Sequence, residues 1–371
     1  MSLVLVTGGA GFIGSHTVDR LVEQGFEVRI LDNLQKPVHM KGQPTYLNRK
    51  AEFVYGDVRD RELLLKTLQG VEYIFHFAAY QDYLPDFSTF FSVNAVGTAL
   101  IYELTVEHHL PVKKIVVASS QFVQGEGLYT KRNGGLVAPT MRGLADLNAG
   151  RWDWFDEYHN PLEWMWTPET HANPPNSYAI SKYTQELQAL RLGKRYDIPT
   201  VVLRYSIVQG ARQSLYNAYS GACRIFSLNY LLNKTPTIYE DGKQSRDFVN
   251  IHDVVDANLL VLRSPEANYE VFNVGGGKAY TILEFDRIVA TEFDRQESSP
   301  NIPGEFRLGD TRNACSDISK LKLLGWSPKR TAKDSVTEYK LYLIEQTDIG
   351  DVLSFAEKKM KDLDVVRRVV R

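Results

Sequence analysis

Residues Gly8-Gly9-Ala10-Gly11-Phe12-Ile13-Gly14 decide the fold of this chain. They follow a short aliphatic run, Leu3 to Val6, and open an amphipathic stretch from Phe12 to Gln24. Glycines between a strand and a helix let the backbone approach a pyrophosphate closely, and the helix N-terminus supplies free N–H groups. The stretch therefore predicts a dinucleotide-binding turn. The alternative is a tight strand-to-helix turn with no ligand.

Strand-like and helix-like segments alternate outward from this loop. The alternation predicts an α/β fold with a Rossmann-type, doubly wound parallel sheet and a smaller C-terminal substrate-binding lobe. After the first strand and helix, we expect strands at 28–31, 53–55, 73–77, 115–117, 200–204 and 237–239, and helices at 60–68, 92–108, 177–195 and 221–232.

Two aspartates end the second and third expected strands. A carboxylate at Asp32 can accept hydrogen bonds from both adenosine ribose hydroxyls and would repel a 2′-phosphate, so the sequence predicts NAD rather than NADP. Asp57 is expected at the adenine edge, and the alternative is a helix cap before Val58.

Tyr178 and Lys182 are four residues apart in an expected helix and therefore share one face. A cation beside a phenol lowers the pKa of the phenol, which would make Tyr178 a general base for a hydroxyl proton. Ser119 and Ser120 end an expected strand, where a hydroxyl can share that proton. These residues predict oxidation of an alcohol carbon.

The motifs together resemble the extended short-chain dehydrogenase/reductases, the family that contains nucleotide-sugar epimerases and dehydratases. The resemblance covers most of the chain, and its motifs occur in order. They are the glycine loop, Phe77-Ala78-Ala79, Asn94, Ser119-Ser120, Tyr178 with Lys182, Leu203-Arg204-Tyr205, Ser245-Arg246-Asp247-Phe248-Val249, His252-Asp253-Val254, Arg307-x-Gly309-Asp310 and Leu324-Gly325-Trp326-x-Pro328.

The resemblance implies a catalytic serine at Ser120, the base at Tyr178, and nicotinamide-ribose binding by Lys182. It places the sugar nucleotide against Ser120, Gln121, Asn217, Tyr239, Arg246 and Arg307. Arginine suits a diphosphate through bidentate contacts, and a surface ion pair is the alternative for either arginine. No metal is expected. The implied NAD contacts are Gly8, Gly11, Phe12, Ile13, Gly14, Asp32, Asn33, Asp57, Val58, Phe77, Ala78, Ala79, Asn94, Ser119, Tyr178, Lys182 and Tyr205.

The same resemblance suggests a division of the chain. Residues 1–205 would form the NAD-binding Rossmann domain, interrupted by an insertion at 127–175. The insertion holds four of the five tryptophans, and we expect it to fold as an aromatic cap near the sugar pocket. Residues 206–348 would form mainly the nucleotide-sugar-binding lobe, with some segments returning to the Rossmann domain. Residues 349–371 are expected to form a helical tail.

The reaction is narrowed by Gln121 and Phe122, which stand where the family's 4,6-dehydratases carry an Asp-Glu pair. We therefore expect 4-epimerisation, in which Tyr178 takes the C4 hydroxyl proton and hydride passes to NAD and returns to the opposite face. Relatives usually have V-Y-G where this chain has Val123-Gln124-Gly125, a departure that leaves the catalytic residues in place.

Three segments point to a narrower group. Residues 125–129, 213–221 and 240–248 resemble epimerases that convert dTDP-L-rhamnose to dTDP-6-deoxy-L-talose, so a dTDP- or UDP-sugar is the expected substrate. The alternatives are a dehydratase, a decarboxylase or a 4-keto reductase of the same fold. A non-catalytic sugar-nucleotide binding protein is disfavoured because the Ser120, Tyr178 and Lys182 set is complete.

Composition limits the partners. A formal net charge of −2 gives no sign of nucleic acid or an anionic membrane as a partner, and two distant cysteines support no disulfide framework or zinc ribbon. We see no basic N-terminal signal and no run of 18 apolar residues, so we expect a cytoplasmic protein. The helices at 92–108 and 177–195 match those that pair into a homodimer in the family, with Leu100, Leu104, Leu187 and Leu190 as candidate interface residues.

Overall fold

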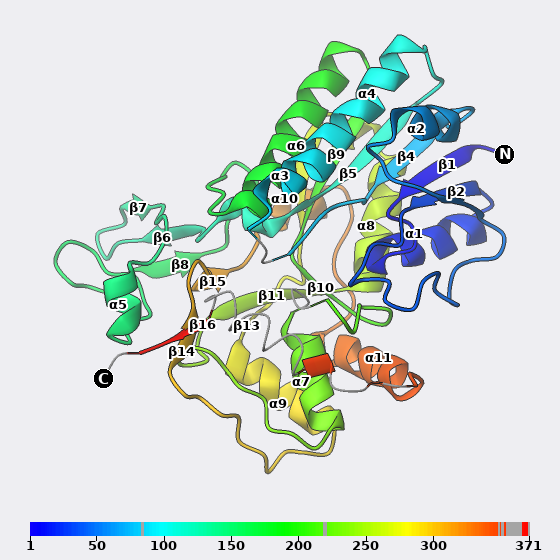
Figure 1. Ribbon diagram of the computed structural model, residues 1–371. Coiled ribbons are helices and arrows are strands. Elements are labelled where there is room, and N and C mark those ends of the chain that lie inside the picture. Colours follow the sequence, from blue (N-terminus) through cyan, green and yellow to red (C-terminus); the bar gives the residue numbers. More distant parts are fainter. Residues whose placement is uncertain (83–84, 218–220, 348, 350–351, 354–365, 370–371) are drawn as a thin grey trace.

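A parallel sheet of seven strands, in the order β12-β9-β5-β4-β1-β2-β3, forms the centre of the protein (Figure 1). The computed structural model describes residues 1–82, 85–217, 221–347, 349, 352–353 and 366–369. The strand order reverses between β1 and β4, and ligands of such sheets bind at the carboxyl ends beside that point. The strands are β1 (Leu3–Thr7), β2 (Glu27–Asp32), β3 (Glu52–Tyr55), β4 (Tyr73–His76), β5 (Lys114–Ser120), β9 (Thr200–Tyr205) and β12 (Glu270–Val274).

Helices cover both faces of this sheet, which confirms the doubly wound fold. Neighbouring residues of a strand point to opposite faces, so Leu5 packs in one core and Val6 in the other, and both are fully buried. Each such aliphatic side chain stabilises the fold by about 1.5–3 kcal/mol. One face carries α1 (Phe12–Glu23) and α8 (Ile251–Arg263), and the other carries α2 (Arg61–Leu68), α4 (Gly97–Glu107) and α6 (Ser177–Arg195).

A smaller lobe with its own apolar core follows β9. The rings of Phe248 and Phe285 lie 4.2 Å apart at its centre. The chain leaves this lobe twice, once for α8 and β12 and once near Ile318 and Leu321, which pack in the Rossmann core. The lobe contains β10 (Ile207–Gln209), β11 (Ser245–Asn250), β13 (Ala279–Thr281), β15 (Asn313–Ala314), α7 (Ala222–Leu231), α9 (Ile282–Glu292) and α11 (Ala332–Ile344).

The tryptophan-rich insertion folds around a three-stranded antiparallel sheet in the order β7-β6-β8, which projects from the body beside the smaller lobe (Figure 1). Trp164 packs edge-on against Trp166, whereas Trp152 packs against Phe306 of the smaller lobe at 5.9 Å between ring centroids. The elements are β6 (Leu128–Thr130), β7 (Leu136–Val137), α5 (Leu144–Asn148) and β8 (Glu163–Met165).

Three expected elements differ in the structure. The helix expected at 92–108 begins as a π-helical segment, η1 (Phe91–Val96), and continues as α4. Residues 237–239 form no strand and make only an isolated bridge from Thr237 to Asn301. Of the expected helical tail at 349–371, residues 350–351, 354–365 and 370–371 lie outside the described residues. Val366–Arg368 forms β16, which pairs antiparallel with β14 (Glu305–Arg307) and is not helical.

The remaining short elements connect these parts. The stretch 87–107 is long and apolar enough to span a membrane by composition, but it packs against α6 and the sheet as a core helix. The short elements are α3 (Phe87–Phe90), the 3₁₀ turns η2 (Gln121–Gln124) and η3 (Pro265–Ala267), and α10 (Ser319–Leu323).

Candidate active site

The glycine loop has no room for side chains. Gly8 adopts a left-handed φ of +68°, and a Cβ there would lie 2.7 Å from the backbone nitrogen of Ala78. A Cβ on Gly14 would lie 2.2 Å from the carbonyl oxygen of Gly8. Gly11 caps α1 without a side chain, so the N–H groups of the first turn face the cavity beside it. This cradle fits a dinucleotide pyrophosphate.

Asp32 is held rigidly at the end of β2. Its carboxylate accepts hydrogen bonds from the backbone N–H groups of Ala10 (3.0 Å) and Leu34 (2.8 Å). His39, a residue that the sequence analysis did not single out, lies 3.9 Å from the same carboxylate and lines the same hollow. Asp32 therefore lines the wall of a pocket that is suited to a ribose.

Asp57 does not cap a helix, because α2 is capped by Asp60, which accepts from the N–H of Leu63. Asp57 instead accepts from Asn33 at 3.0 Å and from Arg59 at 2.8 and 2.7 Å. The hydrogen bonds from Arg59 hold the pKa of Asp57 below its usual range. Asn33, Asp57 and Val58 line the same hollow as Asp32.

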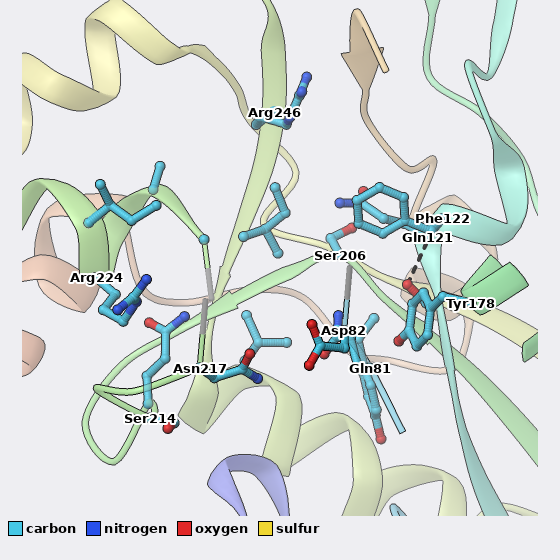
Figure 2. Close-up of a pocket in the computed structure, with 18 of the residues that line it drawn as sticks. Gln81, Asp82, Gln121, Phe122, Tyr178, Ser206, Ser214, Asn217, Arg224 and Arg246 are labelled. Atoms are coloured by element: carbon cyan, nitrogen blue, oxygen red, sulfur yellow. Dashed lines mark hydrogen bonds between the residues drawn. The ribbon is translucent and has the colours of Figure 1, made fainter. Parts of the chain in front are cut away.

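Tyr178 lies in the first turn of α6, where Asn176 caps the helix by accepting from the N–H of Ala179. Its phenol hydrogen-bonds to Ser120 at the end of β5, and Figure 2 shows it beside Gln121 and Phe122. Burial raises the pKa of Tyr178 to about 12, and the bond to Ser120 opposes that rise. The pair can pass a proton to or from a hydroxyl bound between them.

Lys182 lies one helical turn beyond Tyr178 and is almost fully buried. Burial lowers the pKa of Lys182 to about 7, while the carboxylate of Glu186 opposes the change. Burial therefore outweighs the lowering of the phenol's pKa that the sequence predicts. Lys182 lies behind the cavity wall and does not line it.

One cavity of about 880 Å³ joins the glycine loop to the smaller lobe. Arg224 of α7, which the sequence analysis also passed over, reaches the cavity on the side opposite Tyr178 (Figure 2). A lone arginine in an otherwise apolar helix was the available signal for it. The predicted site residues that line this cavity are Gly8, Gly11, Phe12, Ile13, Gly14, Phe77, Ala79, Ser119, Ser120, Gln121, Tyr178, Tyr205, Asn217, Tyr239, Arg246 and Arg307.

The two predicted phosphate-binding arginines reach the cavity in different ways. Arg246 donates to the carbonyl oxygens of Thr311 (2.8 Å) and Arg312 (3.1 Å), and burial lowers the pKa of its guanidinium. Arg307 is paired with Asp310 and lies 5.2 Å from the centroid of the Tyr239 ring. Both guanidinium groups are therefore held at fixed positions in the cavity wall.

Asn94, like Lys182, differs from the other predicted cofactor contacts because it lines neither hollow. It is fully buried and bonds through its amide to the backbone of Tyr80 and to Ser181 Oγ at 2.9 Å. The amide therefore ties η1 to α6 next to Lys182. Ala78 lines the hollow beside Asp32.

The protein combines a Rossmann sheet, a glycine cradle at a helix N-terminus, and Ser120 and Tyr178 at one cavity with Lys182 behind its wall. These features define a dinucleotide-dependent enzyme of the short-chain dehydrogenase/reductase class. The model of the NAD dependent epimerase/dehydratase family matches residues 4–136 and 155–275. The chain belongs to that family, which makes NAD its cofactor.

Relatives cover nearly the whole chain. The dTDP-L-rhamnose 4-epimerase of Burkholderia thailandensis is 36% identical over 356 residues, which are 93% of this chain and 96% of that protein. The UDP-glucose 4-epimerase of Thermotoga maritima, solved with UDP-glucose, is 29% identical with a TM-score of 0.75 and covers 92% of this chain and 99% of its own. The UDP-glucose 4-epimerase of Thermus thermophilus, solved with NAD, is 26% identical with a TM-score of 0.71 over 93% and 100%.

Proposed function

We propose that this protein is an NAD-dependent 4-epimerase of a nucleotide-diphosphate sugar. The observation that carries the proposal is the single cavity that runs from Gly11 through Tyr178 to Arg246 and Arg307. Such a cavity accommodates a dinucleotide and a sugar nucleotide together, with the reacting carbon beside the phenol.

The chain's own residues provide the acid-base chemistry. Bound NAD supplies the hydride acceptor and donor at C4. As its phenolate, Tyr178 takes the C4 hydroxyl proton, and Ser120 shares that proton through their hydrogen bond. Lys182, one turn behind the phenol, is a cation below its pKa of about 7. The same phenol returns the proton when the keto sugar is reduced on its other face.

Gln121 and Phe122 favour epimerisation over dehydration. Both amide atoms of Gln121 are buried at the cavity without a hydrogen-bond partner in the part of the chain that the structure describes. An amide can bind a sugar hydroxyl, but it cannot act as the acid that eliminates water. Phe122 packs against Tyr178, with 6.4 Å between ring centroids.

For the substrate, we propose a dTDP-linked 6-deoxy sugar, dTDP-L-rhamnose being the first candidate. The Burkholderia relative is named for that sugar nucleotide, and the ring of Phe122 offers an apolar contact for a C6 methyl group. A UDP-sugar is the second candidate, because the Thermotoga relative was solved with UDP-glucose.

The test is incubation of the purified enzyme with a panel of dTDP-, UDP-, GDP- and CDP-sugars, with products identified by NMR. We expect a C4 epimer to form from one pyrimidine nucleotide sugar with no net change in added NADH. Stoichiometric NADH consumption would show a 4-keto reductase, and loss of water or carbon dioxide would show a dehydratase or decarboxylase. Any of these three results contradicts the proposal.

We further propose that the enzyme is a cytoplasmic homodimer. Leu187 and Ile180 on α6 and Val96 on η1 are large apolar residues on the surface, 44%, 41% and 52% exposed. Leu104 does not belong to this surface, because it is fully buried in the core, and Leu100 and Leu190 are partly buried beside it. The candidate interface is therefore centred on Leu187, Ile180 and Val96.

A further inference from the structure

The insertion reaches the wall of the cavity through buried charges. Arg142 donates two hydrogen bonds to the carboxylate of Glu240, at 2.9 and 2.7 Å, and all but 3% of each side chain is buried. Glu240 also accepts from Arg312 at 3.0 Å. We call this set, with Glu126, Asp153 and Asp241, the insertion network.

Arg312 connects the network to both parts of the protein. Its guanidinium donates to Asp153 of the insertion at 2.8 Å and to Asp241 of the smaller lobe at 2.7 Å. Its backbone N–H donates to Glu126 at 2.9 Å. Two stretches distant in sequence, 126–153 and 240–312, are thus held together by charge-assisted bonds, which are stronger than neutral ones.

Two hydrogen bonds connect the insertion network to residues that line the cavity. Arg142 donates to the carbonyl oxygen of Asp310 at 2.7 Å, and Asp310 pairs with Arg307. Arg246 donates to the carbonyl oxygen of Arg312 itself. No residue of 127–175 lines the cavity in the described chain, so the insertion acts on the wall from behind and is not an aromatic lid over the sugar.

Glu240 adopts a strained backbone conformation within the network. Glu240 has a φ of +58°, a left-handed conformation that a residue with a Cβ adopts at a cost. In this conformation the carboxylate of Glu240 accepts hydrogen bonds from the guanidinium groups of Arg142 and Arg312. Buried ion pairs are weak contributors to stability compared with apolar packing, so a network of this kind is better explained by the positions that it fixes.

We propose that Arg142 and Glu240 are positioning residues that hold Arg246 and the Arg307–Thr311 segment ready for the diphosphate of the sugar nucleotide. The inference rests on the proposed function for the identity of that ligand. On this proposal, the insertion determines the affinity for the nucleoside diphosphate. It affects neither the choice of sugar nor the chemistry of Tyr178.

The main test replaces both partners at once, Arg142→Met with Glu240→Gly, which removes opposite charges together and leaves Arg312 paired with Asp241 and Asp153. Calorimetry with UDP and dTDP should show dissociation constants raised at least about tenfold. The KM for the sugar nucleotide should rise similarly, while kcat at saturation and the bound NAD stay within about twofold. Arg151→Gln, which breaks an exposed pair with Asp146 in the same insertion, is the matched control and should change nothing.

A milder variant keeps the test decisive if the double variant fails to fold. Asp153→Asn removes the negative charge that faces Arg312 from a side chain that is 57% exposed, and it should raise the same dissociation constants about threefold. Unchanged binding of UDP and dTDP in Asp153→Asn and in a folded double variant overturns the inference. So does a loss confined to kcat or to bound NAD. Failure of the wild-type enzyme to bind either nucleotide would instead contradict the proposed function.

Discussion

Arg204 donates two hydrogen bonds to the carboxylate of Glu186, at 2.9 and 2.8 Å, on the helix α6 that carries Tyr178 and Lys182. Both side chains are nearly fully buried, and Ser119 donates to the same carboxylate. Glu186 lies one turn beyond Lys182 on α6, and its negative charge raises the pKa of that lysine against the effect of burial. The ion pair therefore links β9, the end of β5 and Lys182.

Glu186→Gln should move the pH profile. The pKa of Lys182 is about 7 and lies below its ordinary value, so its cation is present below that pH and is lost above it. Removing the carboxylate charge lowers the pKa further, and the alkaline limb of kcat should shift down by about one pH unit. The unpaired Arg204 should also reduce the free energy of unfolding by about 3 kcal/mol.

The double variant Glu186→Gln with Arg204→Met separates these two effects. It should recover most of the stability while keeping the shifted alkaline limb. A pH profile that recovers together with the melting temperature would show that Glu186 acts only through folding.

Tyr178→Phe should reduce kcat at least about 10²-fold, the usual scale for loss of a general acid-base group. Bound NAD should remain, because the phenol oxygen is the only atom removed. Tyr183→Phe, on the same helix, is the control. Turnover near the wild-type value in Tyr178→Phe would rule out the assigned base.

Asp32→Ala should reduce the preference for NAD over NADP at least about tenfold, because the carboxylate that repels a 2′-phosphate is removed. Titration calorimetry with both nucleotides measures this directly. Wild-type enzyme that bound the two equally would already contradict the prediction.

Gly14→Ala should abolish NAD retention and lower the free energy of unfolding by about 3 kcal/mol, since its Cβ would overlap the Gly8 carbonyl at 2.2 Å. Gly143→Ala is the matched control, because a Cβ there meets only Asp146 at an ordinary 3.5 Å. Bound cofactor in the purified protein and chemical denaturation give the two readouts. Full NAD occupancy in Gly14→Ala would show that the loop tolerates a side chain.

Leu187→Glu should convert a dimer to a monomer in sedimentation velocity at micromolar concentration, because it places a charge on the exposed apolar face of α6. Leu323→Glu, at an exposed position of α10, should leave the dimer intact. A monomeric wild-type protein at that concentration would refute the homodimer.

The sheet and its helices could be predicted because their signals are local. The residues of β1, β5 and β9 are buried on both faces, so each strand is a continuous apolar run that stands out from the helices. The extent of α6, Ser177–Arg195, agrees to the residue with the expected helix, and in the structure Asn176 caps its first turn. Composition alone could not show that 237–239 stays unpaired or that 366–368 is a strand.

The site was only partly predictable because some of its contacts have no local pattern. Tyr178 and Lys182 were visible from their helical spacing, but the pKa of Lys182 depends on burial, which the spacing does not give. The contacts among Arg142, Glu240 and Arg312 join positions that no short motif relates. The tryptophans of the insertion suggested an aromatic cap near the sugar pocket, whereas Trp152 packs on Phe306 behind the cavity wall.

The path of the chain between the lobes has a mechanical consequence. After Tyr205 the chain enters the smaller lobe, at Asn250 it returns directly into α8, and after Val274 it leaves β12 for β13. Several connections therefore cross the cleft. A rigid-body hinge at one linker is not available, because every crossing would have to bend together. Neither lobe is a continuous piece of sequence, so we expect the two to melt in one cooperative transition and not to survive separation by a single proteolytic cut.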